Sequence, residues 1–566
     1  MNSIIKRIKL GLGLIHFLAI PLAFFLYKIP AELLNVKNTS FITNGNESTL
    51  DAAQSVTGLN SFLVQSWTFQ PGTLNNLGSE ANNSILFSNS TPWFSFLLKG
   101  VNSGYTFHNE LLQFIGIELL LGSVLLYIIT YKYFRWEGVS AIVSSFGAML
   151  IMLLPSLQIH WIWPSLSYKF ILIAAIWTAR ATNILTFRKA NVIFFSLGIL
   201  SAATHSYFFP MVFFILFFSL LYKVKSQPKR NAYLLVSNVV GFVLGNYVSG
   251  GFNAGLKGAS AGTQDVGPYA SDLLTYFNSY GTSSILKRLP AQASMEGFSY
   301  PGIAFYLIFA TAFVLMIKNR ETINKFLGSK KLKKFEHVNN KDIVIFETKT
   351  PFKYVNSGGL FLFILSVGPA VPILGQYHWV TQNSYILSAF SIFRASGRFS
   401  WALVFTLMCS ALVILSKNMQ RNLLSTFLIA CLMLHFYEFS SFSQSYKKNI
   451  LTSIDKKTPS KINQIILETN KPIFFVPAFP APDTTPWRSY LIDFIATGGE
   501  VKNFAYMSRI PTPYVISSVE QTEKKFTNNS FESQSYLMIR NDYYSKFKQR
   551  SIVIFEFENW TLVEVK

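Results

Sequence analysis

Two arginines spaced four residues apart are the clearest candidates for anion binding. They lie in the segment FRASGRF, residues 393–399, beside a long apolar run. Residues i and i+4 share one face of a helix, so both guanidinium groups could hold a phosphate through forked hydrogen bonds. Interfacial anchoring and pairing with a carboxylate explain the same spacing. The pattern therefore leaves three interpretations open for Arg394 and Arg398.

Carboxylates in the long hydrophilic segment 29–108 are candidate general bases. They are Glu32, Glu47, Asp51 and Glu80. A carboxylate at a cavity can take a proton from a hydroxyl group when burial brings its pKa toward the working pH. For any single one of them, a solvated surface acid is the simpler interpretation.

The elements that position these residues have the composition of a membrane protein. Of the 566 residues, 50% are hydrophobic and only 13% are charged, whereas an average soluble protein carries about 25% charged residues. Runs such as 11–27, 115–131 and 360–374 approach the roughly 20 apolar residues that cross a hydrocarbon layer about 30 Å thick. This composition excludes an ordinary soluble enzyme.

The distribution of lysine and arginine predicts an orientation. The expected spans are 9–28, 109–130, 138–157, 166–186, 190–206, 208–222, 232–249, 300–317, 357–375, 397–416 and 422–439. With the N-terminus in the cytoplasm, every inner gap between them is basic, as the positive-inside rule requires. These gaps account for the net charge of +22, whereas nucleic-acid binding needs a solvated basic patch or helix. We therefore expect membrane lipid, and no nucleic acid, as a partner.

Composition also divides the chain. Residues 1–440 are expected to form an α-helical polytopic transmembrane domain that includes a first outer loop, residues 29–108. Residues 441–566 are expected to form a small extracytoplasmic α/β domain. Within it, 472–476 and 551–557 have the pattern of strands and 461–468 that of a helix.

Several features together resemble an uncharacterised family of bacterial multi-spanning membrane proteins. These features are a long first outer loop with an Asp, the arginine motif at 393–399, THSY at 204–207 and MEGFSYPG at 295–302. That family is similar in plan to the GT-C glycosyltransferases. The likeness extends through about residue 440, and the arginine and Glu-Gly-Phe motifs are its more specific pieces.

The resemblance implies a GT-C-like fold of about 11 transmembrane helices in the bacterial inner (cytoplasmic) membrane. It implies a polyprenyl phosphate sugar as donor and inverting transfer to a glycan, lipid or protein acceptor. An Asp or Glu in the first outer loop would be the base, and Asp51 matches best. Arg394 and Arg398 would hold the donor phosphate, where negative charge develops on the leaving oxygen.

The same resemblance places His205, Tyr207, Glu296 and Asn89 in the sugar pocket. At Asn89 this chain departs from the pattern of the family that it resembles. Where relatives tend to show an Asp-Ser-Ile-Pro-like segment, this chain has NSTP at 89–92. Asn can hydrogen-bond a sugar hydroxyl but cannot neutralise a divalent ion as a carboxylate does. We therefore expect no essential metal, and no cofactor beyond the lipid-linked donor.

Two other classes of function stay open. A transporter or flippase of lipid-linked saccharides needs a polar path across the membrane, whereas the candidate polar groups here gather at one outer side. A catalytically inactive binding or scaffold protein is favoured by Asn89, since a fold alone does not settle function.

Overall fold

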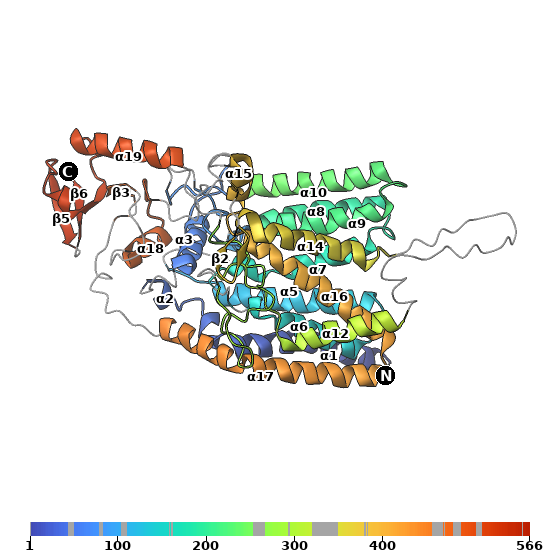
Figure 1. The fold of residues 1–566 in the computed structure, drawn as a ribbon. Coiled ribbons are helices and arrows are strands. Elements are labelled where there is room, and N and C mark those ends of the chain that lie inside the picture. The colour runs from blue at the N-terminus through green and yellow to red at the C-terminus, as the bar shows by residue number, and fades with distance from the viewer. Residues whose placement is uncertain are drawn as a thin grey trace.

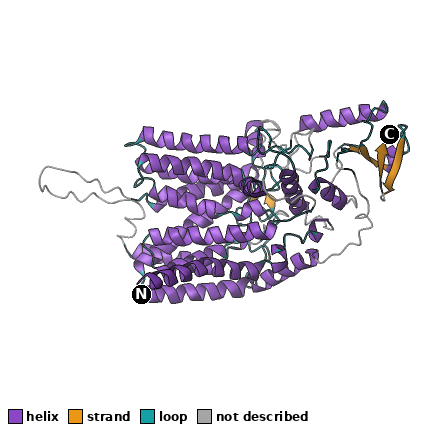
Figure 2. Cartoon of the chain, turned by 180° about the vertical axis from the view of Figure 1, so that it is seen from behind, coloured by secondary structure: helices purple, strands orange, loops and turns teal. Residues whose placement is uncertain are grey.

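The computed structural model describes residues 2–43, 50–78, 83–102, 110–157, 159, 162–252, 267–291, 295–319, 349–378, 381, 383–454, 468, 470–478, 488–504, 512–556 and 559–566. The chain is mostly helical, with a small sheet near the C-terminus (Figures 1 and 2). This confirms the expected helical class and the C-terminal strands.

Long helices run side by side in a bundle (Figure 1). They are α1 (Asn2–Lys28), α5 (Ile115–Trp136), α6 (Ala141–Met152), α7 (Phe170–Ala181), α8 (Phe187–Thr204), α9 (Phe208–Leu220), α10 (Pro228–Val248), α12 (Ile303–Lys318), α14 (Phe352–Val367), α16 (Trp401–Asn418) and α17 (Arg421–Ile454). The N-terminus lies at one end of the bundle, and the C-terminal sheet lies beyond the other end.

Four of the described helices are long and apolar enough to cross a membrane. They are α5, α10, α17, and α16 together with the turn before it. Others, such as α6 with 12 residues, are shorter than the roughly 20 residues that a hydrocarbon layer requires at a rise of about 1.5 Å each. Length and composition therefore do not support the full count of about 11 spans.

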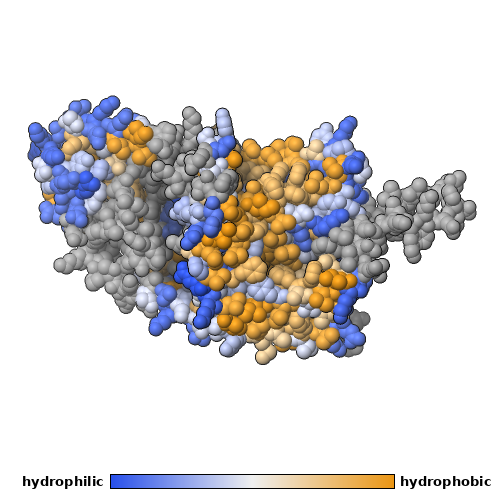
Figure 3. All heavy atoms as spheres, in the orientation of Figure 1, coloured by the Kyte–Doolittle hydropathy of each residue, from blue (hydrophilic) through white to orange (hydrophobic). Residues whose placement is uncertain are grey.

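The outer surface of the bundle carries an apolar belt with polar residues at both ends (Figure 3). On α10 the exposed face is apolar along the helix and includes Tyr233, Val236, Val240 and Val243. An apolar stripe on the outer face of a helix has to be covered by another apolar phase or surface. This belt is consistent with association with membrane lipid.

The first outer loop folds over one end of the bundle. Its elements are η1 (Ala31–Leu34), α2 (Ser40–Thr43), α3 (Leu50–Val64) and α4 (Pro92–Asn102). Short elements at the same end of the bundle are η4 (Pro155–Leu157), η5 (Pro164–Ser167), η8 (Gly368–Ala370), β1 (Pro372–Ile373), β2 (Gln376–Tyr377), α15 (Ser384–Ile392) and η9 (Ser396–Ser400); η6 (Leu221–Lys223) follows α9.

The C-terminal part contains a four-stranded sheet. Its elements are β3 (Ile473–Val476), α18 (Arg488–Ala496), α19 (Thr512–Thr527), β4 (Tyr536–Arg540), α20 (Asn541–Tyr544), β5 (Ser551–Glu556) and β6 (Trp560–Val565). The strand order is β3-β4-β6-β5, with β3 and β4 parallel and the other pairs antiparallel. The helix expected at 461–468 lies outside the described residues except for Glu468.

This C-terminal part shares a hydrophobic core with the first outer loop. Ala52 and Val56 of α3 belong to the same buried cluster as Leu491 and Ile495 of α18. The backbone at Val501 pairs with 76–78 of the loop, with N–H···O distances of 2.8 and 2.9 Å, and also bridges to β3. Residue 440, expected as a domain boundary, lies inside α17.

Candidate functional site

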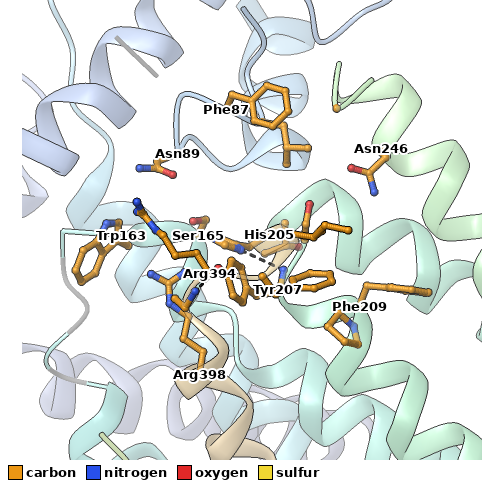
Figure 4. Close-up of a pocket in the computed structure, with 18 of the residues that line it drawn as sticks. Phe87, Asn89, Trp163, Ser165, His205, Tyr207, Phe209, Asn246, Arg394 and Arg398 are labelled. Atoms are coloured by element: carbon orange, nitrogen blue, oxygen red, sulfur yellow. Dashed lines mark hydrogen bonds between the residues drawn. The ribbon is translucent and has the colours of Figure 1, made fainter. Parts of the chain in front are cut away.

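A cavity of about 730 Å³ lies where the first outer loop covers the bundle. Of the described candidate bases, Asp51 lines it and Glu32 does not. The lining also includes the other site residues expected from the sequence: Asn89, His205, Tyr207, Glu296, Arg394 and Arg398. In Figure 4, Asn89, Trp163 and the two arginines lie on one side of the cavity, and Phe209 and Asn246 on the other. Segments far apart in the chain thus meet at one site.

The helix α3 positions the outer wall of the cavity. Asp51 lies in its first turn. One turn further, the Gln54 side chain donates to the carbonyl of Phe87 at 3.2 Å and accepts from the Asn89 amide at 3.2 Å. Ser90 donates to the carbonyl of Ser55 at 2.6 Å. These bonds fix the turn that carries Asn89, whose φ of 60° is in the left-handed region that Asn tolerates better than most residues.

Asp51 is a partly buried carboxyl group beside two cations. Burial raises its pKa above the ordinary value, and the charge of Arg398 opposes this. Glu296 raises the pKa further, whereas a hydrogen bond from the Trp163 side chain and the charge of Arg394 lower it. A carboxyl group with a raised pKa is a stronger base than a solvated one, so Asp51 has the environment that proton abstraction needs.

Arg398 forms a buried, bidentate ion pair with Glu296. Its Nε lies 2.6 Å from Oε2, and its Nη2 lies 2.8 Å from Oε1. Both side chains are largely buried, with 9% and 13% exposed. Of the interpretations that the sequence left open for this arginine, pairing with a carboxylate is therefore the observed one. A paired guanidinium still carries its charge into the cavity, but its planar fork is already occupied.

Close backbone contact makes this ion pair possible. A Cβ added at Gly397 would lie 2.7 Å from Cα of Gly297, below any ordinary contact distance. The hydroxyl groups of Ser271 and Thr275 donate to the carbonyl of Gly297 at 3.2 and 2.5 Å. The Glu-Gly-Phe and arginine motifs are thus packed directly against each other, which explains Gly397, whereas a Cβ added at Gly297 would lie 2.6 Å from Cα of Ser271.

The two arginines do not share a helix face, which corrects the geometry expected from their spacing. The helix α15 ends at Ile392, the chain bends at Arg394, and η9 begins only at Ser396. The hydroxyl of Tyr207 accepts a hydrogen bond from the backbone N–H of Ala395 at 2.8 Å and so holds this bend. The cavity brings the arginines together through tertiary structure.

Arg394 and Arg398 also lie over aromatic rings. The guanidinium carbon of Arg394 is 4.7 Å from the ring centre of Tyr269, and that of Arg398 is 4.8 Å from that of Tyr207. The ring of Tyr207 is thus packed against Arg398 while its hydroxyl holds the bend. Next to it, His205 Nδ1 accepts from the backbone N–H of Tyr207 at 3.3 Å. These contacts indicate that Tyr207 positions the arginines as well as lining the cavity.

The other half of the cavity is aromatic. Phe209 and Phe213 of α9 and Phe242 of α10 line it, and the rings of Phe209 and Phe242 stack with their centres 3.8 Å apart. The cavity is therefore amphipathic, with ionised groups at one side and phenyl rings at the other. Such a cavity suits a molecule that joins an anionic group to a hydrocarbon chain.

Sequence reasoning missed Trp163, Ser165, Asn246 and Tyr269, which also line the cavity. Trp163 and Ser165 come from the connection between α6 and α7. Their residue types alone do not indicate a functional site, because Trp and Ser occur throughout the chain. A Trp-Pro-Ser connection between two apolar runs was the available signal.

Among the described residues, no group of three or more His, Cys, Asp or Glu side chains is arranged to hold a metal ion. Asn89, at the position where the resemblance expects a carboxylate, bonds through its amide to Gln54. Metal independence stays a prediction.

The fold and the cavity define a helical protein with helices long and apolar enough to cross a membrane and an amphipathic site at one end of the bundle. Residues 18–440 match the family described as a domain of unknown function, DUF6311, and the chain belongs to this family. The match covers most of the bundle, the first outer loop and every site residue named above. No curated protein matches the chain.

Proposed function

We propose that the chain is a membrane glycosyltransferase. It transfers a sugar from a polyprenyl phosphate donor to a glycan, lipid or protein acceptor on the extracytoplasmic side, without a cofactor. The observation that carries the proposal is the convergence of Asp51, Arg394 and an aromatic wall on one cavity. Those three components match the acceptor hydroxyl, the donor phosphate and the isoprenoid chain of such a reaction.

In this reaction the acceptor oxygen attacks the anomeric carbon and the bond from that carbon to the phosphate oxygen breaks. Asp51 takes the proton of the acceptor hydroxyl as the new bond forms. Arg394 stabilises the charge that develops on the leaving phosphate. Glu296 holds Arg398 in place, and the positive charge of Arg398 favours the ionised form of the Asp51 carboxyl group. A fraction of Asp51 is therefore ready to accept a proton.

The finer topology belongs to the same proposal. We infer that shorter apolar helices such as α6, α9 and α12 also cross the membrane, which gives about 11 spans in the GT-C plan. The N-terminus is then cytoplasmic, and the cavity and the C-terminal sheet lie outside. The basic gaps between spans support this orientation.

Substitution of Asp51 tests the proposed function. Transfer from polyprenyl phosphate sugars is measured with the protein in lipid nanodiscs. We expect Asp51→Asn to lower the rate by a factor of about 10² to 10⁴, because a general base contributes that much, while donor binding is retained.

Glu32→Gln, at an exposed carboxylate of the same loop, is the matched control and should leave the rate unchanged. The two remaining candidate bases, Glu47 and Glu80, lie outside the described residues. Glu47→Gln and Glu80→Gln are therefore measured in the same assay. Transfer at the wild-type rate in Asp51→Asn rules out Asp51 as the base.

A binding or scaffold protein is the second candidate. The pairing of Arg398 with Glu296 and the neutral Asn89 both favour it, since each reduces the free charge that a donor phosphate or a metal would meet. Under this alternative, wild-type protein binds polyprenyl phosphate sugars and transfers none. A flippase instead moves the donor between leaflets, which a leaflet-specific assay detects.

A further inference from the structure

The described residues of the connection between α6 and α7 contribute to the cavity. The connection contains η4 and η5, and Trp163 and Ser165 from it line the cavity. Within η5, the N–H of Leu166 donates to the carbonyl of Trp163 at 2.9 Å. The Ser167 hydroxyl donates to the carbonyl of Pro164 at 2.7 Å. The backbone around Ser165 is therefore fixed by local bonds.

Ser165 differs from Ser167 in the hydrogen bonding of its side-chain hydroxyl group. Its side chain is buried, with 1% of the residue exposed, and the hydroxyl has no hydrogen-bond partner in the described part of the chain. A buried polar group without a hydrogen-bond partner destabilises the folded state. Ser165 and Arg394 line the same cavity (Figure 4), so a molecule bound there can supply the missing hydrogen bond.

The base of the loop is held by buried ammonium groups. Lys169 Nζ donates to the carbonyl of Ser156 at 2.7 Å and lies 3.8 Å from the ring centre of Trp401. Lys28 Nζ donates to the carbonyl of Met152, also at 2.7 Å. The bond from Lys169 to Ser156 closes the loop across its base. A binding group held in place before the ligand arrives loses little entropy when it binds.

We propose that Ser165 is a ligand-binding residue that donates a hydrogen bond to a phosphoryl oxygen of the bound lipid, beside Arg394, and that Lys169 is a positioning residue for this loop. The identity of the lipid as a polyprenyl phosphate rests on the proposed function. The hydroxyl supplies a neutral donor next to a guanidinium, a combination suited to an oxygen with partial negative charge.

The experiment compares Ser165→Ala with Ser167→Ala, using polyprenyl phosphate without a sugar as the probe and protein in nanodiscs. Ser165→Ala should weaken binding about ten-fold or more, since a hydrogen bond to a charged group is lost. Its melting temperature without ligand should stay at or above the wild-type value, because no protein contact is removed. Ser167→Ala, which loses an internal bond, should lower the melting temperature and leave the affinity within about two-fold.

Lys169→Met tests the positioning role in a double-mutant cycle. We expect Lys169→Met to weaken binding, and Ser165→Ala to have a smaller effect on affinity in that background than in the wild type. Fully additive effects contradict the positioning role.

The experiment distinguishes failure of the inference about Ser165 from failure of the proposed function. Wild-type binding with equal affinity in Ser165→Ala overturns the inference about Ser165 and leaves the proposed function intact. Absence of polyprenyl phosphate binding by the wild type overturns both.

Discussion

Arg398 has a carboxylate partner before any ligand arrives, and this changes what the two arginines can do. An anion entering the cavity meets Arg394, whose guanidinium group lies over the face of Tyr269, and competes with Glu296 for Arg398. Glu296 is thus a competitor for the same guanidinium as the proposed substrate. The pair also protects the site, because a lone buried charge is costly.

Glu296→Gln separates these two effects. The variant should be less stable than the wild type, because Arg398 loses its ionised partner; losing one member of a buried pair costs about 3–5 kcal/mol. It should also bind polyprenyl phosphate more tightly, because the guanidinium fork becomes available. Thermal melts and binding isotherms in nanodiscs measure the two quantities. Weaker binding together with lower stability would mean that Glu296 mainly shapes the cavity.

How much of the site follows from sequence can be judged residue by residue. Asp51 and Glu296 were singled out through the loop and the motif that carry the family resemblance, and Arg398 through its spacing from Arg394. The Arg398–Glu296 pair could not be predicted, because it depends on the contact between Gly297 and Gly397, far apart in sequence. Ser165 could not be found either, since what distinguishes it is a buried hydroxyl group without a hydrogen-bond partner among the described residues.

At the scale of elements, α3 is held from two sides. One face packs on α18, and the other carries the bonds from Gln54 and Ser55 to the turn at 87–90. The sequence predicted the C-terminal strands and a long loop at residues 29–108. It could not predict that they share a core, because α3 and α18 each have the pattern of an ordinary buried helix. The position of Asp51 thus depends on the C-terminal part.

Asp493 of α18 makes this interface sensitive to pH. Burial raises its pKa to about 6, above the unfolded value of about 4. Its contribution to stability is therefore fully present below about pH 4 and is lost as the pH rises through 6. We expect Asp493→Asn to be more stable than the wild type at pH 7.5, by at most about 3 kcal/mol, and equal to it at pH 4.

Hydrogen exchange of α18 at the two pH values measures this difference. Asp542→Asn, at an exposed carboxylate paired with Arg540, is the control and should show no gain at pH 7.5. An Asp493→Asn variant that is equally destabilised at both pH values contradicts the assignment.

At the scale of the whole molecule, the proposed orientation places the cavity and the sheet on one side of the membrane. Cysteine substitutions at two exposed serines test it in intact cells with an impermeant thiol reagent. Ser545, after α20, should be labelled, and Ser226, between α9 and α10, should not. Opening the cells should make Ser226→Cys react, which controls for accessibility. The opposite pattern places the cavity in the cytoplasm.

The pairing of Val501 with residues 76–78 also sets an order of assembly. During synthesis the first outer loop emerges early, but the strand and the helix that cover α3 emerge only after the whole bundle has been made. Until then α3 presents Ala52 and Val56 without their cover from α18. The cover over α3 can therefore be completed only after the C-terminal part has been synthesised. A chain that terminates before α18 contains the motifs of the site, but its helix α3 lacks the cover that α18 provides. The exposed apolar face of α3 is then a feature that proteolytic quality control can recognise.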